Sequence, residues 1–541
     1  MSERYSSLED LQFDNSFANT LPADPVEDNY CRQVTNACYS NVTPAATSAP
    51  KLISFSSEMA AALNIEESVC TSNTFTEVFS GNKILPGMHP CATSYGGHQF
   101  GNWAGQLGDG RAINLGEVLT PSNERWTLQL KGAGPTPYSR TADGFAVLRS
   151  SIREYVCSEA MHHLGVPTTR ALSILLTGEQ VKRDMFYDGN PQEELGAIVC
   201  RVAPSFTRFG HFQLPAALEN QDILRQLINY TISKDFPDLK LPLDSNNQFS
   251  NDAILEWFQE VCKRTAVMIV EWMRVGFVHG VMNTDNMSIL GLTIDYGPYG
   301  WLENYDPTWT PNTTDAHGKR YRYGQQPQIA LWNLVQLANA LYPLIKEVRP
   351  LEEALKSYQE TYDRCNHLML ASKLGLKQFA PETDSKLTDE LFQILEKVET
   401  DMTIFFRKLA KVQNTKNFTK DEVAYKLLLP AYYKSDDNTG RYKTDLNKWL
   451  KSYNTRLKRE VSTPVEREQK MNKVNPNYVF RNYLAQLAID EATNGNFTPV
   501  NDLLTVLKKP YVDHSENNKY AQKRPEWARN RPGCSMLSCS S

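Results

Sequence analysis

The sequence predicts an α+β chain of two lobes, a small β-rich lobe and then a larger helical lobe, with a helical C-terminal extension. Two observations lead to this class. Between residues 93 and 202, short apolar runs of strand type are separated by clustered glycines, as in hairpins. After about residue 211, apolar residues recur at helical spacing instead, most regularly from Asp252 to Val275.

The composition is that of a folded globular chain. The chain has 541 residues, of which 41% are hydrophobic and 10% aromatic, and this excludes wholesale disorder. With a net charge of −5, the chain lacks the excess of basic residues expected of a nucleic-acid-binding protein. No apolar run is long enough to span a membrane. Residues 1–28 are acidic and contain neither a transit peptide nor an apolar secretory segment. We therefore expect a cytoplasmic monomer that binds neither nucleic acid nor membranes.

Changes in composition and in the spacing of apolar residues divide the chain into five parts. They are an N-terminal arm and lead-in (1–90), the small lobe (91–210), the large lobe (211–375), a helical C-terminal region (376–513) and a flexible tail (514–541). The expected strands are Ala112–Leu119, Trp126–Lys131, Ala171–Leu176 and Gly196–Val202, and the expected helices are Ala146–Leu164, Asp252–Val275 and Ile329–Leu344.

Three features of the small lobe follow the order found in protein kinases. Gly108, Gly110 and Arg111 lie in a glycine-rich turn just before a strand, where backbone amides can approach a phosphate. Taken alone, such a turn is better explained as a tight hairpin without a ligand. Lys131 ends the second strand, and Glu154 lies on the following helix. In kinases the corresponding glutamate orients the lysine toward phosphate, so this order predicts a kinase-like small lobe.

Two polar clusters in the large lobe correspond to the catalytic loop and the metal-binding loop of a kinase. The first contains Asp285 and Asn286, and the second is Asp295-Tyr-Gly297. The apolar, strand-like run Met287–Ile294 predicts a β-hairpin with a cluster at each end. Oxygen donors from Asn286 and Asp295 suit Mg²⁺ or Mn²⁺.

One departure from the kinase pattern bears on the reaction. Val281 stands where a kinase carries its catalytic aspartate, and the nearest acid is Asp285. Either the chain is inactive, or the nucleotide is bound in another pose and another phosphorus is attacked. Arg201 and Arg208, seven residues apart around a bend, could hold a triphosphate in such a pose, and Asp143-Gly144 could add a contact.

Several motifs resemble those of the selenoprotein O family, also called the YdiU family, of protein adenylyltransferases. The resemblance covers nearly the whole chain. Its motifs are Ser94-Tyr-Gly-Gly-His-Gln-Phe-Gly-Asn-Trp-Ala-Gly-Gln-Leu-Gly-Asp-Gly-Arg111, Leu130-Lys-Gly-Ala-Gly-Pro-Thr-Pro-Tyr-Ser-Arg140, Asn283-Thr-Asp-Asn-Met287, Asp295-Tyr-Gly-Pro298, Asn475-Pro-Asn-Tyr478 with Arg481-Asn482, and Cys539-Ser-Ser541.

The resemblance implies a kinase-like fold that binds ATP in a flipped orientation and transfers AMP to Ser, Thr or Tyr hydroxyls of proteins, possibly including itself, with release of pyrophosphate. It implies that Asp285 accepts the proton, that Glu154 orients Lys131, and that Asn286 and Asp295 hold the metal. The implied ATP contacts are Gly108, Gly110, Arg111, Lys131, Asp143, Gly144, Arg201, Arg208 and Asp295.

The tail carries two cysteines, Cys534 and Cys539, among small polar residues, a position suited to redox chemistry. In the family the place of Cys539 is taken by selenocysteine in eukaryotic members and by cysteine in most bacterial members. Some bacterial relatives pair this residue with a cysteine in the activation segment. The corresponding segment here, 304–315, has no cysteine, so a local Cys534–Cys539 bridge is the alternative.

Four other activities stay open at this point. They are phosphoryl transfer by a true kinase with Asp285 as base, UMP transfer with Mn²⁺, nucleotide binding by an inactive pseudokinase scaffold, and a redox function of the tail.

Overall fold

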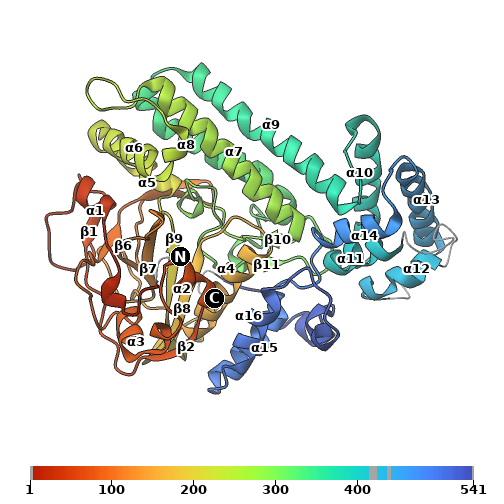
Figure 1. Cartoon of the computed structure of the whole chain (residues 1–541), viewed down its shortest axis with the longest axis horizontal. Helices are drawn as coiled ribbons and strands as arrows, with labels where there is room; N and C mark the ends of the chain where they lie inside the picture. Colours follow the sequence, from red (N-terminus) through yellow and green to blue (C-terminus); the bar gives the residue numbers. More distant parts are fainter. Residues whose placement is uncertain (1–3, 413–422, 435–439, 539–541) are drawn as a thin grey trace.

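The computed structural model describes residues 4–412, 423–434 and 440–538 (Figure 1). A sheet-containing lobe built from the first part of the chain adjoins a lobe of long helices, and further helices follow toward the C-terminus. This is the predicted mixed architecture of a kinase-like fold. Within the described part of the chain, no helix is both long and apolar enough to cross a membrane.

The small lobe is built on an antiparallel sheet of seven strands in the order β1-β3-β6-β7-β9-β8-β2. These strands are β1 (Tyr39–Asn41), β2 (Lys51–Phe55), β3 (Cys91–Thr93), β6 (Ala112–Leu119), β7 (Arg125–Lys131), β8 (Arg170–Arg183) and β9 (Gln192–Ala203). Two short strand pairs lie outside it, β4 (Gly96–Gln99) with β5 (Asn102–Gln106), and β10 (Phe277–Val278) with β11 (Gly300–Trp301).

Alternating side chains of the sheet enter two cores. Along β9, Ile198 and Val202 join a cluster with Phe75 and other residues of the N-terminal segments. Val199 points to the opposite face and joins Ile152 in the main core. The helices on the two faces are α2 (Ser57–Ala62), α3 (Asn73–Phe79) and α4 (Leu148–His163).

The large lobe consists mainly of helices α5 (Phe209–Ala217), α6 (Gln221–Asp235), α7 (Asn251–Val275), α8 (Gln326–Ile345) and α9 (Val348–Lys373). Helix α7 has clear start and stop signals. The Ser250 hydroxyl accepts the Ala253 N–H at 3.2 Å, and Gly276 ends the helix at φ +75°. The Trp257, Ile269 and Trp272 side chains of α7 are buried in the main core.

The C-terminal helices divide between two cores. Helices α10 (Pro381–Lys397), α11 (Met402–Val412), α12 (Val423–Leu428), α13 (Gly440–Leu457) and α14 (Pro464–Asn472) surround a second core, which also includes Val278, Leu302 and Tyr323 of the large lobe. Helices α15 (Asn482–Thr493) and α16 (Thr498–Leu507) join the main core instead and lie beside α4 (Figure 1).

The N-terminal arm is more ordered than the sequence suggests. The arm contains α1 (Ser16–Thr20) and edge strand β1, and Leu8 and Leu11 are buried. Asp14 N–H donates to the Glu117 carbonyl at 3.0 Å, so the arm extends the edge of the small lobe. The sheet therefore includes β1 and β2 from the segment 1–90.

The prediction of a β-hairpin over Met287–Ile294 is wrong. Residues 284–286 form a 3₁₀ turn, and the backbone that follows bonds to segments between the lobes. Ile289 N–H donates to the Thr207 carbonyl at 3.0 Å, and Thr293 N–H to the Pro167 carbonyl at 2.8 Å. These longer-range partners satisfy the backbone groups that a hairpin would have paired locally.

Candidate functional site

Five charged side chains converge where β7, β9 and α4 meet the loops of the large lobe. Lys131 ends β7, Glu154 lies on α4 and Arg201 on β9, whereas Arg208 precedes α5 and Asp295 follows the 3₁₀ turn Thr284–Asn286. Lys131, Glu154, Arg201 and Arg208 are each less than 9% exposed. Burying this many charged side chains together is favourable only when positive groups pair with negative groups.

Lys131 and Arg201 share the same two acids. Lys131 Nζ lies 2.5 Å from Glu154 Oε2 and 3.5 Å from Asp295 Oδ1. Arg201 Nη1 lies 3.1 Å from Glu154 Oε1 and 2.6 Å from Asp295 Oδ1. Burial lowers the pKa of Lys131, although Glu154 and Asp295 act against that shift. The pairing predicted between Lys131 and Glu154 is thus present in the structure.

Arg208 occupies the other oxygen of Asp295. Its Nη1 pairs with Asp295 Oδ2 and donates to the Asp285 carbonyl at 2.8 Å, and its Nη2 lies 3.5 Å from Asp109 Oδ1. Burial alone would raise the pKa of Asp295, but Arg208, Arg201 and Lys131 outweigh it and hold the pKa well below the usual value. Asp295 also has φ +58°, an uncommon backbone conformation that this ionic network retains.

The two arginines keep some hydrogen-bonding capacity unused. The Nε atoms of Arg201 and Arg208 are buried and have no hydrogen-bond partner among the described residues. A buried N–H without a partner is unfavourable, so both atoms are suited to an acceptor such as a phosphate oxygen.

Asp285 and Asn286 lie in the 3₁₀ turn Thr284–Asn286. Asp285 Oδ2 accepts a hydrogen bond from Gln99 at 3.2 Å, whereas its Oδ1 is buried without a partner in the described structure. Burial raises the pKa of Asp285 to about 6. Asn286 donates through its side-chain nitrogen to the Val281 carbonyl at 2.9 Å, so its oxygen is the atom it can offer a metal ion.

The glycine-rich turn packs tightly against the segment that follows β7. A Cβ on Gly108, at φ +80°, would lie 2.4 Å from the Tyr138 ring, and a Cβ on Gly110 would lie 2.8 Å from the Tyr138 carbonyl. Both glycines are therefore required by local packing. Arg111 lines a small pocket together with Lys131 and Glu154.

Asp143 and Gly144 serve a different local purpose. The Asp143 carboxylate forms a two-pronged ion pair with Arg183, with both N–O distances 2.7 Å. Gly144, at φ +79°, passes so close to Gly134 that a Cβ would lie 2.3 Å from its carbonyl. The Asp143 side chain is thus held by Arg183 rather than by the Lys131–Asp295 cluster.

Comparison with known proteins identifies the family. The family model described as protein adenylyltransferase SelO matches residues 27–508. The chain belongs to the selenoprotein O family. It is 57% identical to a protein nucleotidyltransferase YdiU of Rhodopirellula baltica, over 98% of this chain and 99% of the relative. Relatives with the same name from Azoarcus sp. strain BH72 and Aromatoleum aromaticum are 57% and 55% identical, over 98% and 99% of this chain and 99% and 100% of their own. The chain is accordingly an enzyme of the nucleotidyltransferase class.

Several side chains that support the site of this selenoprotein O family member were not predicted from the sequence. Asp109 is 3% exposed and accepts from Thr93 and Tyr95 as well as from Arg208. Gln129 accepts a hydrogen bond from Arg201 Nη2. The position of Asp109 between Gly108 and Gly110 could have indicated a role in the site, whereas nothing in the sequence distinguishes Gln129 from another polar residue of a strand.

His211 is a further unpredicted member of the site. Its Nδ1 accepts the Arg208 backbone N–H at 3.0 Å, and burial, with a smaller effect of the Arg208 charge, lowers its pKa to about 3. The imidazole is therefore neutral in the folded enzyme at any pH above that value.

The low pKa of His211 predicts a pH dependence of stability. Below about pH 6.5 the unfolded chain binds a proton at this residue that the folded chain does not bind, so stability falls as the pH falls. Between about pH 6.5 and 4.5, the parent enzyme should lose about 2 kcal/mol more unfolding free energy than His211→Asn, whose amide oxygen can still accept the Arg208 N–H. Urea denaturation across this range measures the difference, and parallel curves for the two proteins would contradict it.

The tail of this selenoprotein O family member packs against the large lobe, whereas the sequence suggests a flexible segment from residue 514 on. Leu537 N–H donates to the Pro311 carbonyl at 3.0 Å, and its carbonyl accepts the Thr313 N–H at 2.7 Å. Cys534 is 4% exposed, and burial raises its pKa to about 11, so its thiol is protonated at neutral pH. Cys539 lies outside the described residues, and the proposed redox role of the tail stays a prediction.

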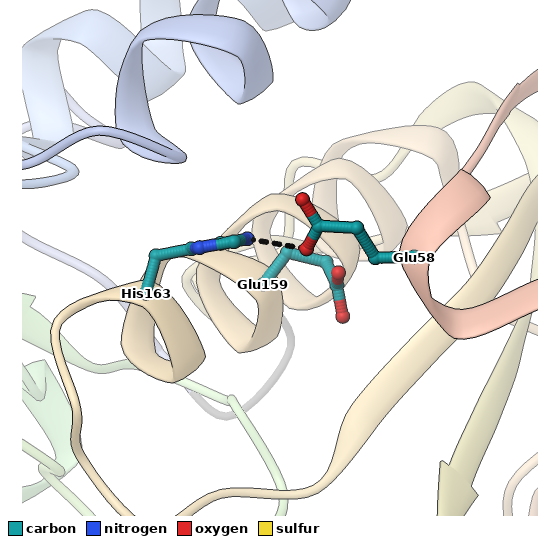
Figure 2. A group of neighbouring side chains, drawn as sticks. All are labelled: Glu58, Glu159 and His163. Carbon is teal, nitrogen blue, oxygen red and sulfur yellow. Dashed lines mark ion pairs between the residues drawn. The ribbon is translucent and has the colours of Figure 1, made fainter. Parts of the chain in front are cut away.

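A separate group of titratable side chains, Glu58, Glu159 and His163, lies beside α2 and α4 (Figure 2). His163 Nε2 lies 2.9 Å from Glu58 Oε2. Both oxygens of Glu159 are bound by Arg170, at 2.6 and 2.7 Å. Because the Arg170 charge would oppose a bound cation, this group is an ion-pair network that joins α4 to α2 and to the start of β8.

Proposed function

We propose that the enzyme transfers AMP from ATP to Ser, Thr or Tyr hydroxyls of proteins and releases pyrophosphate. The observation that carries the proposal is the convergence of Lys131, Arg201 and Arg208 on one carboxylate, Asp295, in a site where Val281 replaces the kinase base. Three buried cations that meet at one carboxylate are suited to a triphosphate that takes its place. The printed names of the relatives, protein nucleotidyltransferase, support the same class of reaction and substrate.

The donor set fits a divalent metal ion. Asp295 and Asn286 offer hard oxygen donors, and the Asp285 oxygen without a partner lies in the same loop. When bound, Mg²⁺ or Mn²⁺ would neutralise charge on the phosphate oxygens. The arginines now occupy both oxygens of Asp295, so we infer that the triphosphate displaces Asp295 from Arg201 and Arg208 and leaves its carboxylate available to the metal.

The reaction forms one P–O bond and breaks another. The acceptor hydroxyl oxygen attacks the α-phosphorus, its proton passes to Asp285, and the bond between the α-phosphorus and the bridging oxygen breaks to release pyrophosphate. Lys131, oriented by Glu154, offsets the charge of the leaving pyrophosphate together with Arg201 and Arg208. We infer that ATP binds in the flipped orientation, with Arg111, Gly108 and Gly110 as further contacts. Asp143 and Gly144 stay proposed contacts, although the Asp143 carboxylate is paired with Arg183 in this structure.

The position of the labelled phosphate in ATP distinguishes AMP transfer from the other possible reactions. The enzyme is incubated with Mg²⁺ or Mn²⁺ and with ATP labelled at the α- or the γ-phosphate, or with α-labelled UTP, and the intact mass of every labelled protein is measured. We expect label from α-ATP alone and a mass gain of one AMP. Label from γ-ATP would identify a kinase, a preference for UTP a uridylyltransferase, and ATP binding without any label an inactive scaffold.

A further inference from the structure

A basic loop lies outside the nucleotide site described above. Residues 317–322 read His-Gly-Lys-Arg-Tyr-Arg, and His317 and Lys319 are exposed. Three permanent positive charges within four residues stand out in a chain whose net charge is −5. None of the proposed steps of AMP transfer uses these cations.

Asp315 holds the backbone of the loop in one conformation. The Asp315 carboxylate accepts the N–H of Arg320 at 2.9 Å and of Tyr321 at 2.7 Å, and the Asp315 carbonyl accepts the Lys319 N–H at 2.7 Å. Because Asp315 is engaged by backbone groups, the side chains of Lys319 and Arg320 do not determine the turn. Lys319 is exposed, whereas Arg320 is half-buried against Trp332.

Tyr321 joins this loop to the catalytic loop. Its hydroxyl donates to Asn283 Oδ1 at 2.6 Å and accepts the Phe100 N–H at 3.0 Å. Asn283 is two residues before Asp285, the proposed proton acceptor. The basic loop is therefore fixed next to the position where an acceptor hydroxyl must arrive.

Aromatic side chains lie beside the basic loop. The Arg320 guanidinium stacks 4.6 Å from the centre of the Trp332 ring. His98 is 5.6 Å from Trp332 and 5.1 Å from Trp103, which is 40% exposed on the β4–β5 hairpin. The surface thus combines cations with flat apolar rings, a composition common in protein-binding sites.

The charge of Asp315 acts on Arg320 and Arg322, but its carboxylate accepts backbone N–H groups of the loop rather than pairing with these side chains. Over the described ranges, Lys319, Arg320 and Arg322 form no ion pair, and the Nε and Nη2 atoms of Arg320 lack a hydrogen-bond partner. Arg322 uses its guanidinium on the Lys319 carbonyl and on Gln325. An acidic partner would supply the missing counter-charge.

We propose that residues 317–322, together with Trp103 and Trp332, bind an acidic segment of the protein that accepts the nucleotide. The proposal rests on AMP transfer to a protein, and it adds the kind of sequence that the enzyme selects. Asp or Glu residues near the acceptor hydroxyl would contact Lys319 and Arg320 while the hydroxyl reaches Asp285.

Peptides of matched design test the proposal. Each carries one Ser, Thr or Tyr flanked by Glu, by Gln or by Lys. Binding is measured by fluorescence anisotropy without ATP, and transfer is measured with α-labelled ATP. We expect the Glu series to bind about tenfold more tightly than the Gln series, with a correspondingly lower KM and a similar kcat. The difference should shrink as NaCl is raised, because salt screens exposed charges.

The charge-reversed double variant Lys319→Glu/Arg320→Glu should lose this preference or invert it, with its affinity for ATP unchanged. The matched control reverses another adjacent basic pair, Lys458→Glu/Arg459→Glu just after α13, and should behave as the parent. Circular dichroism establishes that both are folded, and Lys319→Gln provides a milder change.

The outcomes separate the two proposals. If peptides are labelled equally well whatever their flanking charge, or if the double variant keeps the parent's preference, the docking surface is wrong while AMP transfer stands. If Glu peptides bind selectively but neither peptide nor enzyme gains AMP, the reaction is wrong while the docking surface stands.

Discussion

Replacing Asp295 with alanine should lower the rate of AMP transfer by at least about 10²–10³-fold. Asp295 is the single carboxylate that Lys131, Arg201 and Arg208 share, and it is one of the two oxygen donors we assign to the metal. The substitution removes a metal ligand and also leaves three buried cations with less counter-charge. Transfer from α-labelled ATP, measured at saturating Mg²⁺ and at saturating Mn²⁺, gives the effect on kcat.

The structural part of this loss can be separated from the chemical part. Breaking a buried ionic network is destabilising by about 3–5 kcal/mol, so Asp295→Asn, which keeps the size and polarity of the side chain, is measured beside Asp295→Ala. The control Asp222→Ala changes an exposed acid in the first turn of α6. If folded Asp295→Ala retained AMP incorporation within a few-fold of the parent, the assignment of Asp295 to the metal would be wrong.

Elements with strong local patterns were predictable from the sequence. The strand Ala112–Leu119 was predicted with its observed bounds, and α7 begins one residue before the predicted Asp252. In both, side-chain periodicity and nearby glycines contain the structural information. The pairing of Lys131 with Glu154 was predictable for a different reason, since it follows from the order of motifs along the chain.

Elements whose conformation depends on distant partners were not predictable. Met287–Ile294 has the composition of a strand, but its backbone bonds to Thr207 and Pro167 instead of forming a local hairpin. The arm before residue 50 and the tail after residue 514 are polar and irregular in sequence, yet each packs against the body of the enzyme. In such segments the decisive hydrogen bonds join residues far apart in sequence.

The same limit applies to the candidate site. Sequence motifs pointed to Lys131, Arg201, Arg208 and Asp295, because residues of these types recur in phosphate chemistry. They could not indicate that Arg201 and Arg208 hold both oxygens of one carboxylate. This arrangement gives Asp295 two successive roles in our proposal, first as counter-ion to the arginines and then as metal ligand once phosphate has replaced it.

Replacing Asp285 with asparagine should lower kcat by about 10²–10⁴-fold while ATP binds within a few-fold of its normal affinity. Asparagine has nearly the size of aspartate and can keep the contact with Gln99, but it cannot accept the proton of the attacking hydroxyl. Asp285 Oδ1 is buried without a partner among the residues that the structure describes, so this atom is available for that proton.

Single-turnover transfer and equilibrium ATP binding measure the two quantities separately, with Asp252→Asn at the exposed start of α7 as the matched control. A kcat near that of the parent would mean that the proton leaves by another route, and equal loss of ATP binding would mean that Asp285 supports the nucleotide site rather than the chemical step.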